Sequence, residues 1–342
     1  MDRKKDQQRL SKIQGCLIGG AIGDALGATI EFDSINQVLA RYGKEGITDF
    51  VNKYGTAGIF TDDTQMSLFS CEGILNYFNS DHSFVNIDDL VIEIWKSYKN
   101  WYITQSVPFS ANDKDKYDSR LMKFENLFAN RAPGGTCLSS LQSGKFGTMD
   151  DQINNSKGCG TVMRIAPAGF IENIDNFELG CKIGALTHGH PTGYLASGCL
   201  AQIISYISHG DSILNSIKKS IKILKKYEYH EQTLEAVEKA VDFYKLGLTP
   251  NYQIVEMLGG GWIAEEALSI ALYCALDYQE DFQKALILSV NHSGDSDSTG
   301  AITGNILGTY IGIEAIPKKW IDEVEMSSEI LEMAVGLYSL LK

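Results

Sequence analysis

The chain has 342 residues, 44% of them hydrophobic, and a formal net charge of −13 at pH 7. This length and hydrophobic fraction suit a globular protein with one large core or at most two modest ones. The negative charge disfavours non-specific binding to nucleic acid, because phosphate contacts need clustered Lys and Arg side chains.

The N-terminal segment predicts neither export nor a membrane span. It is charged, MDRKKDQQRLSKIQG, and Asp24 interrupts the apolar run that follows, which argues against a signal peptide or a span. The seven cysteines are scattered and form no CxxC pair, so neither a disulfide framework nor a structural zinc site is indicated. We therefore expect a cytoplasmic protein without membrane or nucleic acid partners. Residues 1–12 are either an N-terminal extension or the first turns of the opening helix.

Most segments predict α-helix. Apolar residues recur at three- and four-residue intervals from Asp89, from Ser212 and from Ala264, which is the spacing of one helix face. The one basic run, KKSIKILKKY from Lys218, is predicted to be a solvated helix face. The turn-rich stretches that separate the helices are 105–118, 131–136, 142–160 and 247–262. None is long enough for a domain linker, so we predict one all-α domain over residues 1–342.

Two segments carry a glycine at every fourth position. One stripe runs from Gly15 to Gly27 and the other from Gly300 to Gly312. At that spacing the glycines line one face of a helix, and each costs about 1 kcal/mol relative to Ala. Close backbone packing can offset this cost. We therefore expect both helices at the centre of the domain, packed by their glycine faces, with packing on each other as one possibility.

Two clusters of acids and hydroxyls stand at predicted helix starts. They are TDDT, from Thr61, and GDSDST, from Gly294. One interpretation is capping, with Asp62 as one cap answered by Gln65, and Asp297 as the other. The clusters contain no Lys or Arg, however, and buried carboxylates must be hydrated, protonated or bound to a cation. Oxygen ligands favour Mg²⁺, Mn²⁺ or Ca²⁺ over Zn²⁺, so the two loops together predict a site for two cations.

Seven segments then carry a resemblance over nearly the whole chain from about Ile13. In order, they are GCLIGGAIGDALGATIEF, FTDDTQMSLF, RAPGGT, GCGTVMRIAPAG, LTHGHPTGY, GGGWIAEEAL and NHSGDSDSTGAITGNILG. They resemble the ADP-ribosylglycohydrolase family, which includes the dinitrogenase reductase-activating glycohydrolases and the ADP-ribosylarginine hydrolases. The resemblance implies a compact orthogonal all-α bundle with two Mg²⁺ ions, or Mn²⁺ in their place. It also implies hydrolysis of the bond between ADP-ribose and the side chain of an ADP-ribosylated protein.

The resemblance assigns the acid clusters. The implied metal ligands are Thr61, Asp62, Asp63, Asp295, Asp297 and Ser298. Ser298 stands where the family often has Thr, and its hydroxyl oxygen is equivalent. Glu31 matches an acid that some members place over the scissile ribose, although a surface residue at a helix end is the alternative. Asp62, Asp63 or Glu31 is expected to transfer the proton as the catalytic acid or base.

The resemblance also suggests contacts with ADP-ribose. The expected substrate-binding residues are Glu31, Gly158, Cys159, Gly160, His188 and Trp262. The glycine-rich segment precedes a predicted helix, so its backbone N–H groups could bind the pyrophosphate, with an ordinary turn as the alternative. Lys157 and Arg164 could add positive charge, unless Arg164 is structural. The histidine matches a family position near the ligand or packs in the core, and the tryptophan offers a stacking face or fills the core.

The linkage that is cleaved stays open in the sequence. We favour ADP-ribosylarginine, because GDALGATIEF, APAG and GDSDSTGAI resemble the bacterial arginine-type members. Serine-linked and O-acetyl-linked ADP-ribose are the alternatives. Two other classes of protein also fit: a non-catalytic binder of ADP-ribose, and a protein that blocks an ADP-ribosyltransferase through residues 1–10 or 105–118.

Overall fold

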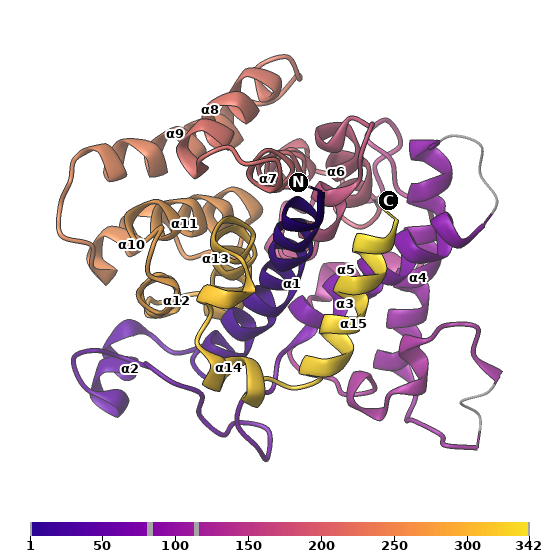
Figure 1. The fold of residues 1–342 in the computed structure, drawn as a ribbon, viewed down its shortest axis with the longest axis horizontal. Helices are drawn as coiled ribbons and strands as arrows, with labels where there is room; N and C mark the ends of the chain where they lie inside the picture. The colour runs from indigo at the N-terminus through magenta and orange to yellow at the C-terminus, as the bar shows by residue number, and fades with distance from the viewer. Residues whose placement is uncertain (1, 81–84, 113–115, 341–342) are drawn as a thin grey trace.

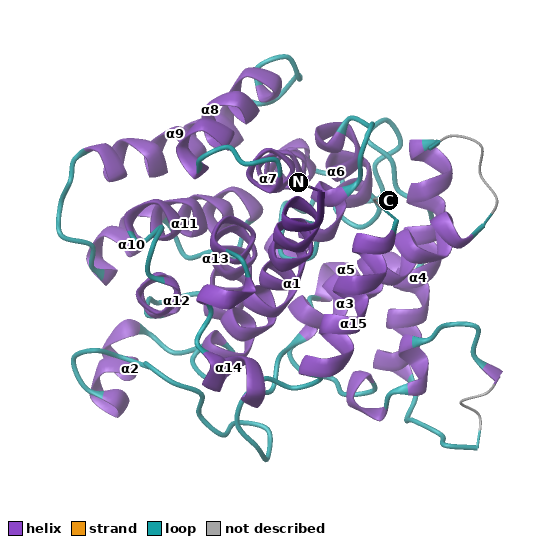
Figure 2. Cartoon of the chain, viewed as in Figure 1, coloured by secondary structure: helices purple, strands orange, loops and turns teal. Residues whose placement is uncertain are grey.

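The computed structural model describes residues 2–80, 85–112 and 116–340. Within these ranges the chain consists of α-helices, short 3₁₀ turns and loops, and its only β-type pairing is an isolated bridge between Gly158 and Ile263 (Figure 2). The all-α prediction is confirmed. Residues 2–12 form the first turns of a helix and not a separate extension, while Met1 lies outside the described residues.

Two helices from opposite ends of the chain form the centre of the fold (Figure 1). They are α1 (Asp2–Gly27) and α13 (Ser296–Ile311). A Cβ built on Gly19 would lie 2.4 Å from the carbonyl oxygen of Gly304. The same close approach joins Gly15 to Gly308 and Gly23 to Gly300. Because the numbers rise along one helix as they fall along the other, the pair is antiparallel and the predicted glycine packing is confirmed.

The other helices surround this pair. Their bounds are α2 (Ile35–Tyr42), α3 (Asp62–Asn79), α4 (Ile87–Ser106), α5 (Gly135–Gln142), α6 (Asn176–Ala185), α7 (Pro191–Ser208), α8 (Ile213–Leu224), α9 (Glu231–Lys245), α10 (Tyr252–Leu258), α11 (Ala264–Asp277), α12 (Phe282–Val290), α14 (Lys318–Glu323) and α15 (Ser327–Ser339). In Figure 1, α11 and α12 lie beside α13, whereas α3, α4 and α15 lie on the far side of α1. Helices α8 and α9 form an outer layer over this arrangement.

A buried lysine joins α1 to this surrounding layer. Lys12 is only 7% exposed, and its Nζ donates hydrogen bonds to the carbonyl oxygens of Ile207 at 2.7 Å and Ser208 at 3.3 Å. These carbonyls end α7, where a helix leaves acceptors unpaired and where the helix dipole favours a positive charge. Lys12 of α1 therefore caps the C-terminal end of α7.

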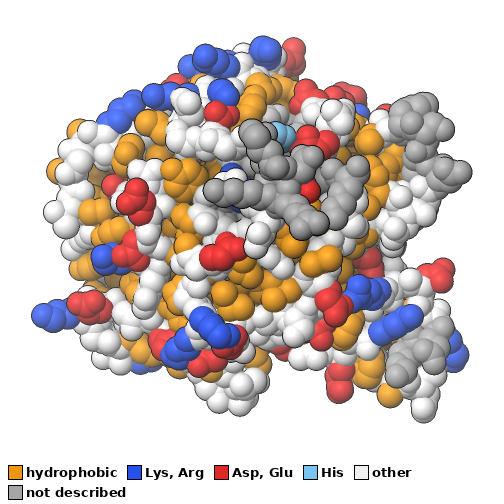
Figure 3. Space-filling view, in the orientation of Figure 1, with side chains coloured by type: hydrophobic (Ala, Val, Ile, Leu, Met, Phe, Trp, Pro, Cys, Tyr) orange, Lys and Arg blue, Asp and Glu red, His pale blue; other side chains and the backbone are white. Residues whose placement is uncertain are grey.

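The basic run of α8 is solvated, as predicted. Its lysines are exposed, and two of them form ion pairs, Lys219 with Asp211 at 2.6 Å and Lys225 with Glu238 at 3.1 Å. Figure 3 shows cationic side chains along the edge of the molecule over α8 and α9. In the part of the chain that the structure describes, no helix combines the length and the apolar character needed to cross a bilayer.

Candidate functional site

The two acid clusters meet at the N-terminal ends of α3 and α13. The hydroxyl oxygen of Thr61, at the start of α3, lies 3.1 Å from Oδ2 of Asp297 in the first turn of α13. Thr61 is fully buried behind a cavity of about 360 Å³, a volume within the range of small-molecule sites. The other predicted ligands line this cavity directly: Asp62, Asp63, Asp295, Asp297 and Ser298.

Asp24 of α1 takes the capping role at the start of α3. Its carboxylate accepts hydrogen bonds from the backbone N–H groups of Thr61 at 2.8 Å and Thr64 at 2.9 Å. The capping interpretation of Asp62 and Gln65 is therefore wrong: Thr61 is the N-cap residue, and the Gln65 side chain binds elsewhere, with Oε1 accepting from the indole of Trp101. Because a distant helix supplies the cap, the carboxylates of the first turn can face the cavity.

The capping interpretation is also wrong in its detail at α13. Asp295, and not Asp297, is the N-cap residue, and its side chain accepts from the N–H of Ser298 at 3.3 Å. The backbone N–H of Asp295 donates to the carbonyl oxygen of Gly260 at 2.8 Å. The GGGW loop therefore holds the start of α13, and positive φ angles of 134° at Gly259 and 77° at Gly261 explain its glycines.

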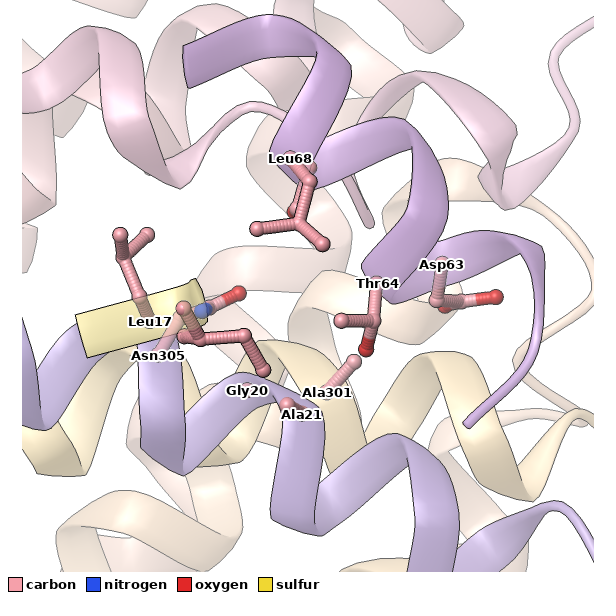
Figure 4. A pocket seen from close by; sticks show the side chains of 10 residues that line it. Leu17, Gly20, Ala21, Asp63, Thr64, Leu68, Ala301 and Asn305 are labelled. Atoms are coloured by element: carbon pink, nitrogen blue, oxygen red, sulfur yellow. The ribbon is translucent and has the colours of Figure 1, made fainter. Parts of the chain in front are cut away.

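Successive residues of α3 point in different directions at the junction with α1 and α13. Both Asp63 and Thr64 line a small cavity, and Figure 4 shows the Thr64 side chain turned toward these two helices while the carboxylate of Asp63 extends to the side. The Thr64 hydroxyl donates to Oδ2 of Asp24 at 2.6 Å. This geometry fixes the first turn of α3 from behind and directs Asp63 into the larger cavity.

Buried negative charge dominates the electrostatics of the cavity. Burial raises the pKa of Asp62, Asp63 and Asp295 well above the usual value for Asp, and the charge of Asp297 raises all three further. Burial, followed by repulsion from the acids of α13, raises the pKa of Glu31 to about 10. The lining residues include no Lys or Arg. The acids therefore need protons or cations to remain buried.

The donor set has the chemistry of a hard-cation site. All of its donors are oxygens, which suit Mg²⁺ or Mn²⁺. Oδ1 of Asp63 and Oε2 of Glu31 are buried without a hydrogen-bond partner, so unsatisfied acceptors are present in the cavity. Among the described residues, no three His, Cys, Asp or Glu side chains already stand at the spacing that one ion requires. The two-cation centre stays a prediction, consistent with the donor types.

The glycine-rich segment lines the cavity in a form that the sequence did not predict. No α-helix follows it; the structure has only a 3₁₀ turn, Cys159–Thr161. The N–H of Cys159 donates to the carbonyl oxygen of Trp262 at 3.1 Å, and its thiol donates to Oδ2 of Asp295 at 2.8 Å. A Cβ on Gly160 would lie 2.8 Å from Sγ of Cys137, so a larger residue at this position would have to displace the Cys137 side chain. The predicted helix is wrong, and the N–H of Cys159 is already paired.

Neither nearby cation points into the cavity. Arg164 is fully buried, with its guanidinium 4.5 Å from the ring centre of Tyr98 and its Nη2 donating to the hydroxyl of Thr187 at 2.6 Å. The structural alternative for Arg164 is therefore correct. Lys157 forms an ion pair with Glu265 and does not line the cavity.

His188 lies beneath the glycine-rich segment and lines the cavity. Its Nε2 is 3.2 Å from the position that a Cβ on Gly158 would occupy. Burial, together with the positive charge of Arg164, lowers the pKa of His188 to about 3. The imidazole is therefore neutral at physiological pH and can act as a hydrogen-bonding group.

An aromatic pair stands at the mouth of the cavity. Trp262 is 44% exposed and lines the cavity, so it is not a core residue. Its ring stacks on that of Phe32, with centroids 5.7 Å apart and an interplanar angle of 22°. Lys53 covers the ring of Phe32, with Nζ 5.8 Å from its centre. The mouth therefore offers an exposed aromatic face. The sequence predicted only Trp262 for this role, and Phe32, directly after Glu31, was missed.

Residues 5–342 match the family model described as ADP-ribosylglycohydrolase. The chain belongs to this family. It is 22% identical to the ADP-ribosylarginine hydrolase Tri1 of Pseudomonas putida, over 97% of this chain and 79% of the relative. It is 23% identical to the ADP-ribosyl-[dinitrogen reductase] glycohydrolase of Rhodospirillum rubrum, over 92% and 90% of the two chains. A solved structure described as an ADP-ribosylglycohydrolase-related protein complex has the same fold, with a TM-score of 0.67 and 21% identity over 98% of this chain and all of that one.

Two further parts of this ADP-ribosylglycohydrolase site were missed from the sequence. Asp24 was noted as an interruption of an apolar run and within a segment of the resemblance but was given no role, although an acid inside a glycine-striped helix is itself a signal of a specific partner. The loop 132–136 forms one wall of the cavity, and the N–H of Gly134 donates to Oδ2 of Asp62 at 3.0 Å. Its PGG sequence indicated a turn, but nothing local indicated that the turn would contact a cluster so far away in sequence.

Proposed function

We propose that this protein is a Mg²⁺-dependent hydrolase that removes ADP-ribose from a modified protein side chain. Among the possible side chains we propose arginine. The observation that carries the proposal is the meeting of the acidic starts of α3 and α13 in one cavity with an aromatic mouth. Membership of the family and the names of the two relatives support it.

The acids and hydroxyls of the two helix starts would hold two Mg²⁺ ions, with Mn²⁺ as a substitute. The donors are Thr61, Asp62, Asp63, Asp295, Asp297 and Ser298. Bound cations in such sites polarise substrate oxygens and lower the pKa of a water molecule. The free Oδ1 of Asp63 is an unused acceptor at this place, which supports its role as a ligand.

Glu31 is the carboxyl group that we assign to proton transfer. It lines the cavity, is only 5% exposed, and keeps Oε2 without a hydrogen-bond partner. Its burial raises its pKa, so it holds a proton more readily than an ordinary Glu. Glu31 would donate this proton to the side-chain nitrogen that leaves C1″ of the ribose.

Trp262 would bind the far end of ADP-ribose. Its exposed ring at the cavity mouth offers a flat apolar face, which suits stacking of the adenine base. His188 lies deeper in the cavity and can offer a neutral hydrogen-bonding group to the same ligand. The ligand would therefore extend from the acids at the floor to the aromatic pair at the mouth.

The charge of the cavity favours arginine over serine as the leaving side chain. Five acidic side chains line it, Glu31, Asp62, Asp63, Asp295 and Asp297, and no basic one does. Two divalent cations would offset the charges of the four aspartates, while Glu31 carries the proton that it donates. Once that proton is transferred, the Glu31 carboxylate can form charge-assisted hydrogen bonds with a departing guanidinium group, whereas a departing serine hydroxyl carries no charge.

Turnover on defined linkages tests the proposal. Arginine-, serine- and glutamate-linked ADP-ribosylated proteins and O-acetyl-ADP-ribose would be incubated in Mg²⁺ and in EDTA. We expect release of ADP-ribose from the arginine-linked protein, lost in EDTA and reduced at least about 100-fold in Asp62→Ala and Asp297→Ala. Glu72→Gln is the matched control, since Glu72 is a buried acid of α3 bound by Ser119 and Leu121 outside the cavity.

Other outcomes point to the alternative functions. Cleavage of the serine-linked protein or of O-acetyl-ADP-ribose alone would overturn the arginine assignment, and calorimetric binding of ADP-ribose without turnover would identify a non-catalytic binder. Blocking of an ADP-ribosyltransferase would appear as capture of that enzyme by Asp62→Ala. Two segments were predicted to make such a contact, residues 1–10 and 105–118. In the first, residues 2–10 belong to α1, and in the second, residues 113–115 lie outside the described residues.

A further inference from the structure

A buried ion pair lies behind the wall of the cavity. It joins Arg131, which precedes the loop 132–136, to Glu325, in the link between α14 and α15. Nη2 of the arginine is 3.0 Å from Oε1 of the glutamate, Nη1 contacts the second carboxylate oxygen, and the side chains are 10% and 9% exposed. Two parallel contacts of this kind fix direction as well as distance. We refer to Arg131 and Glu325 as the positioning pair.

Arg131 contacts the segment that leads into α3. Its Nη1 donates to the carbonyl oxygen of Phe60 at 2.9 Å, and Phe60 directly precedes Thr61. Three residues beyond Arg131, the N–H of Gly134 donates to Oδ2 of Asp62 at 3.0 Å. The arginine therefore stands between the backbone that carries Asp62 and the loop that orients the Asp62 carboxylate.

The loop itself is strained. Ala132 has a φ of 54°, in the left-handed region that a residue with a Cβ adopts only at an energetic cost. Such a conformation persists when surrounding contacts determine it, and the ion pair of the preceding residue is such a contact. Loss of the pair would let the loop relax away from Asp62.

Glu325 is anchored in turn. Its N–H donates to the carbonyl oxygen of Gly58 at 2.9 Å, and Nδ2 of Asn126 donates to its Oε1 at 2.8 Å. Gly58 lies in the same segment as Phe60, so the C-terminal link is tied to the entry of α3 at two points. The carboxylate is therefore held in place by contacts that do not involve Asp62.

We propose that Arg131 and Glu325 are positioning residues that hold Asp62 in the orientation needed to bind a divalent cation. The assignment rests on the proposed function, in which Asp62 is a metal ligand. It goes beyond that function by making the distant C-terminal link part of the site. Neither residue lines the cavity, so neither touches the substrate.

The test compares Glu325→Gln and Arg131→Lys with a matched pair elsewhere. Arg9 and Glu172 form a half-buried ion pair between α1 and the loop before α6, and Glu172→Gln and Arg9→Lys make the same two changes at residues that do not line the cavity. Mn²⁺ affinity would be measured on the full-length protein by electron paramagnetic resonance. We expect roughly 10-fold weaker Mn²⁺ binding in the positioning-pair variants and wild-type affinity in the controls. Glu325→Asp should recover part of the loss.

Two further readouts separate positioning from general stability. In steady-state kinetics, kcat should fall while KM for the ADP-ribosylated protein is unchanged, since the pair does not touch substrate. In hydrogen exchange, the amide of Gly134 should exchange faster in Glu325→Gln than in wild type, whereas Glu172→Gln should leave it unchanged. A folded Glu325→Gln with wild-type Mn²⁺ affinity overturns the proposal.

The outcomes distinguish this proposal from the proposed function. Wild-type protein that binds Mn²⁺ but releases no ADP-ribose refutes the hydrolase and leaves the affinity test of the pair valid. If wild-type protein binds no Mn²⁺, the metal site is refuted, and with it the assignment of the pair as positioning residues for a cation ligand. If the amide of Gly134 also exchanges at the wild-type rate in Glu325→Gln, the proposed influence of the pair on the loop 132–136 is refuted as well.

Discussion

At the scale of single residues, the cost of buried negative charge determines how this site behaves. Burial, with the nearby charge of Asp297, raises the pKa of Asp24 to about 7 and that of Asp62 and Asp63 well above the usual value. These groups bind protons in the folded chain at a pH where the unfolded chain has released them. By linkage, their contribution to stability is lost as the pH rises through the folded pKa values.

The loss of stability with rising pH predicts how the effect of Mg²⁺ on stability will depend on pH. Mg²⁺ should raise Tm by more at pH 8 than at pH 7, because protons compete with the cation for carboxylates of raised pKa and compete less at the higher pH. Burial lowers the pKa of His188 to about 3 and that of His292 to about 4, so these two buried imidazoles stay neutral over this pH interval. Thermal unfolding in EDTA and in Mg²⁺ would measure the shift. A Mg²⁺ effect that is the same at both pH values, or that survives in Asp63→Asn, would contradict the prediction.

At the scale of helices, the glycine faces of α1 and α13 bring two backbones into contact. This contact places the end of α1, with Asp24, beside α3, and it places the start of α13 opposite the start of α3. Because each glycine weakens its own helix, the arrangement is stable only while the two faces stay close. The site therefore depends on packing that lies outside it.

Gly19→Ala tests this dependence. The new Cβ would lie 2.4 Å from the carbonyl oxygen of Gly304, so we expect a loss of about 1–3 kcal/mol in the free energy of unfolding. Gly135→Ala is the control, because no atom lies within 4 Å of its Cβ position in α5. Its stability should be unchanged or slightly higher. Urea denaturation measures both variants, and equal stability of Gly19→Ala and wild type would refute the packing argument.

At the scale of the whole molecule, both ends of the chain support one centre. α1 packs on α13 and α15, Lys12 closes the end of α7, and Glu325 reaches back to the loops of the cavity. The site combines residues from several separate stretches of sequence. The chain should therefore behave as one cooperative unit, as the sequence predicted for a single domain.

Calorimetry tests whether the chain unfolds as one cooperative unit. We expect one unfolding transition, moved as a whole to higher temperature by Mg²⁺, because the proposed ligands lie at the meeting point of helices from both ends of the chain. Truncation before α14 should abolish that transition and not merely shift it. Two separate transitions, of which Mg²⁺ moves only one, would show that the chain is divided into independent units.

The sequence determined the features that depend on local pattern. Helical periodicity, the glycine stripes and the two acid clusters are readable because each arises from residues a few positions apart. The all-α class follows from these patterns, whereas the type of bundle and the roles of the acids came from the resemblance to the family. Tertiary structure alone decided the cap that Asp24 supplies to α3, the pairing of Cys159 with Trp262, and the contact of Arg131 with Glu325. Each of these joins residues far apart in the chain, and its geometry depends on the register in which helices pack. A local pattern carries the chemistry of a residue but not the position of its distant partner.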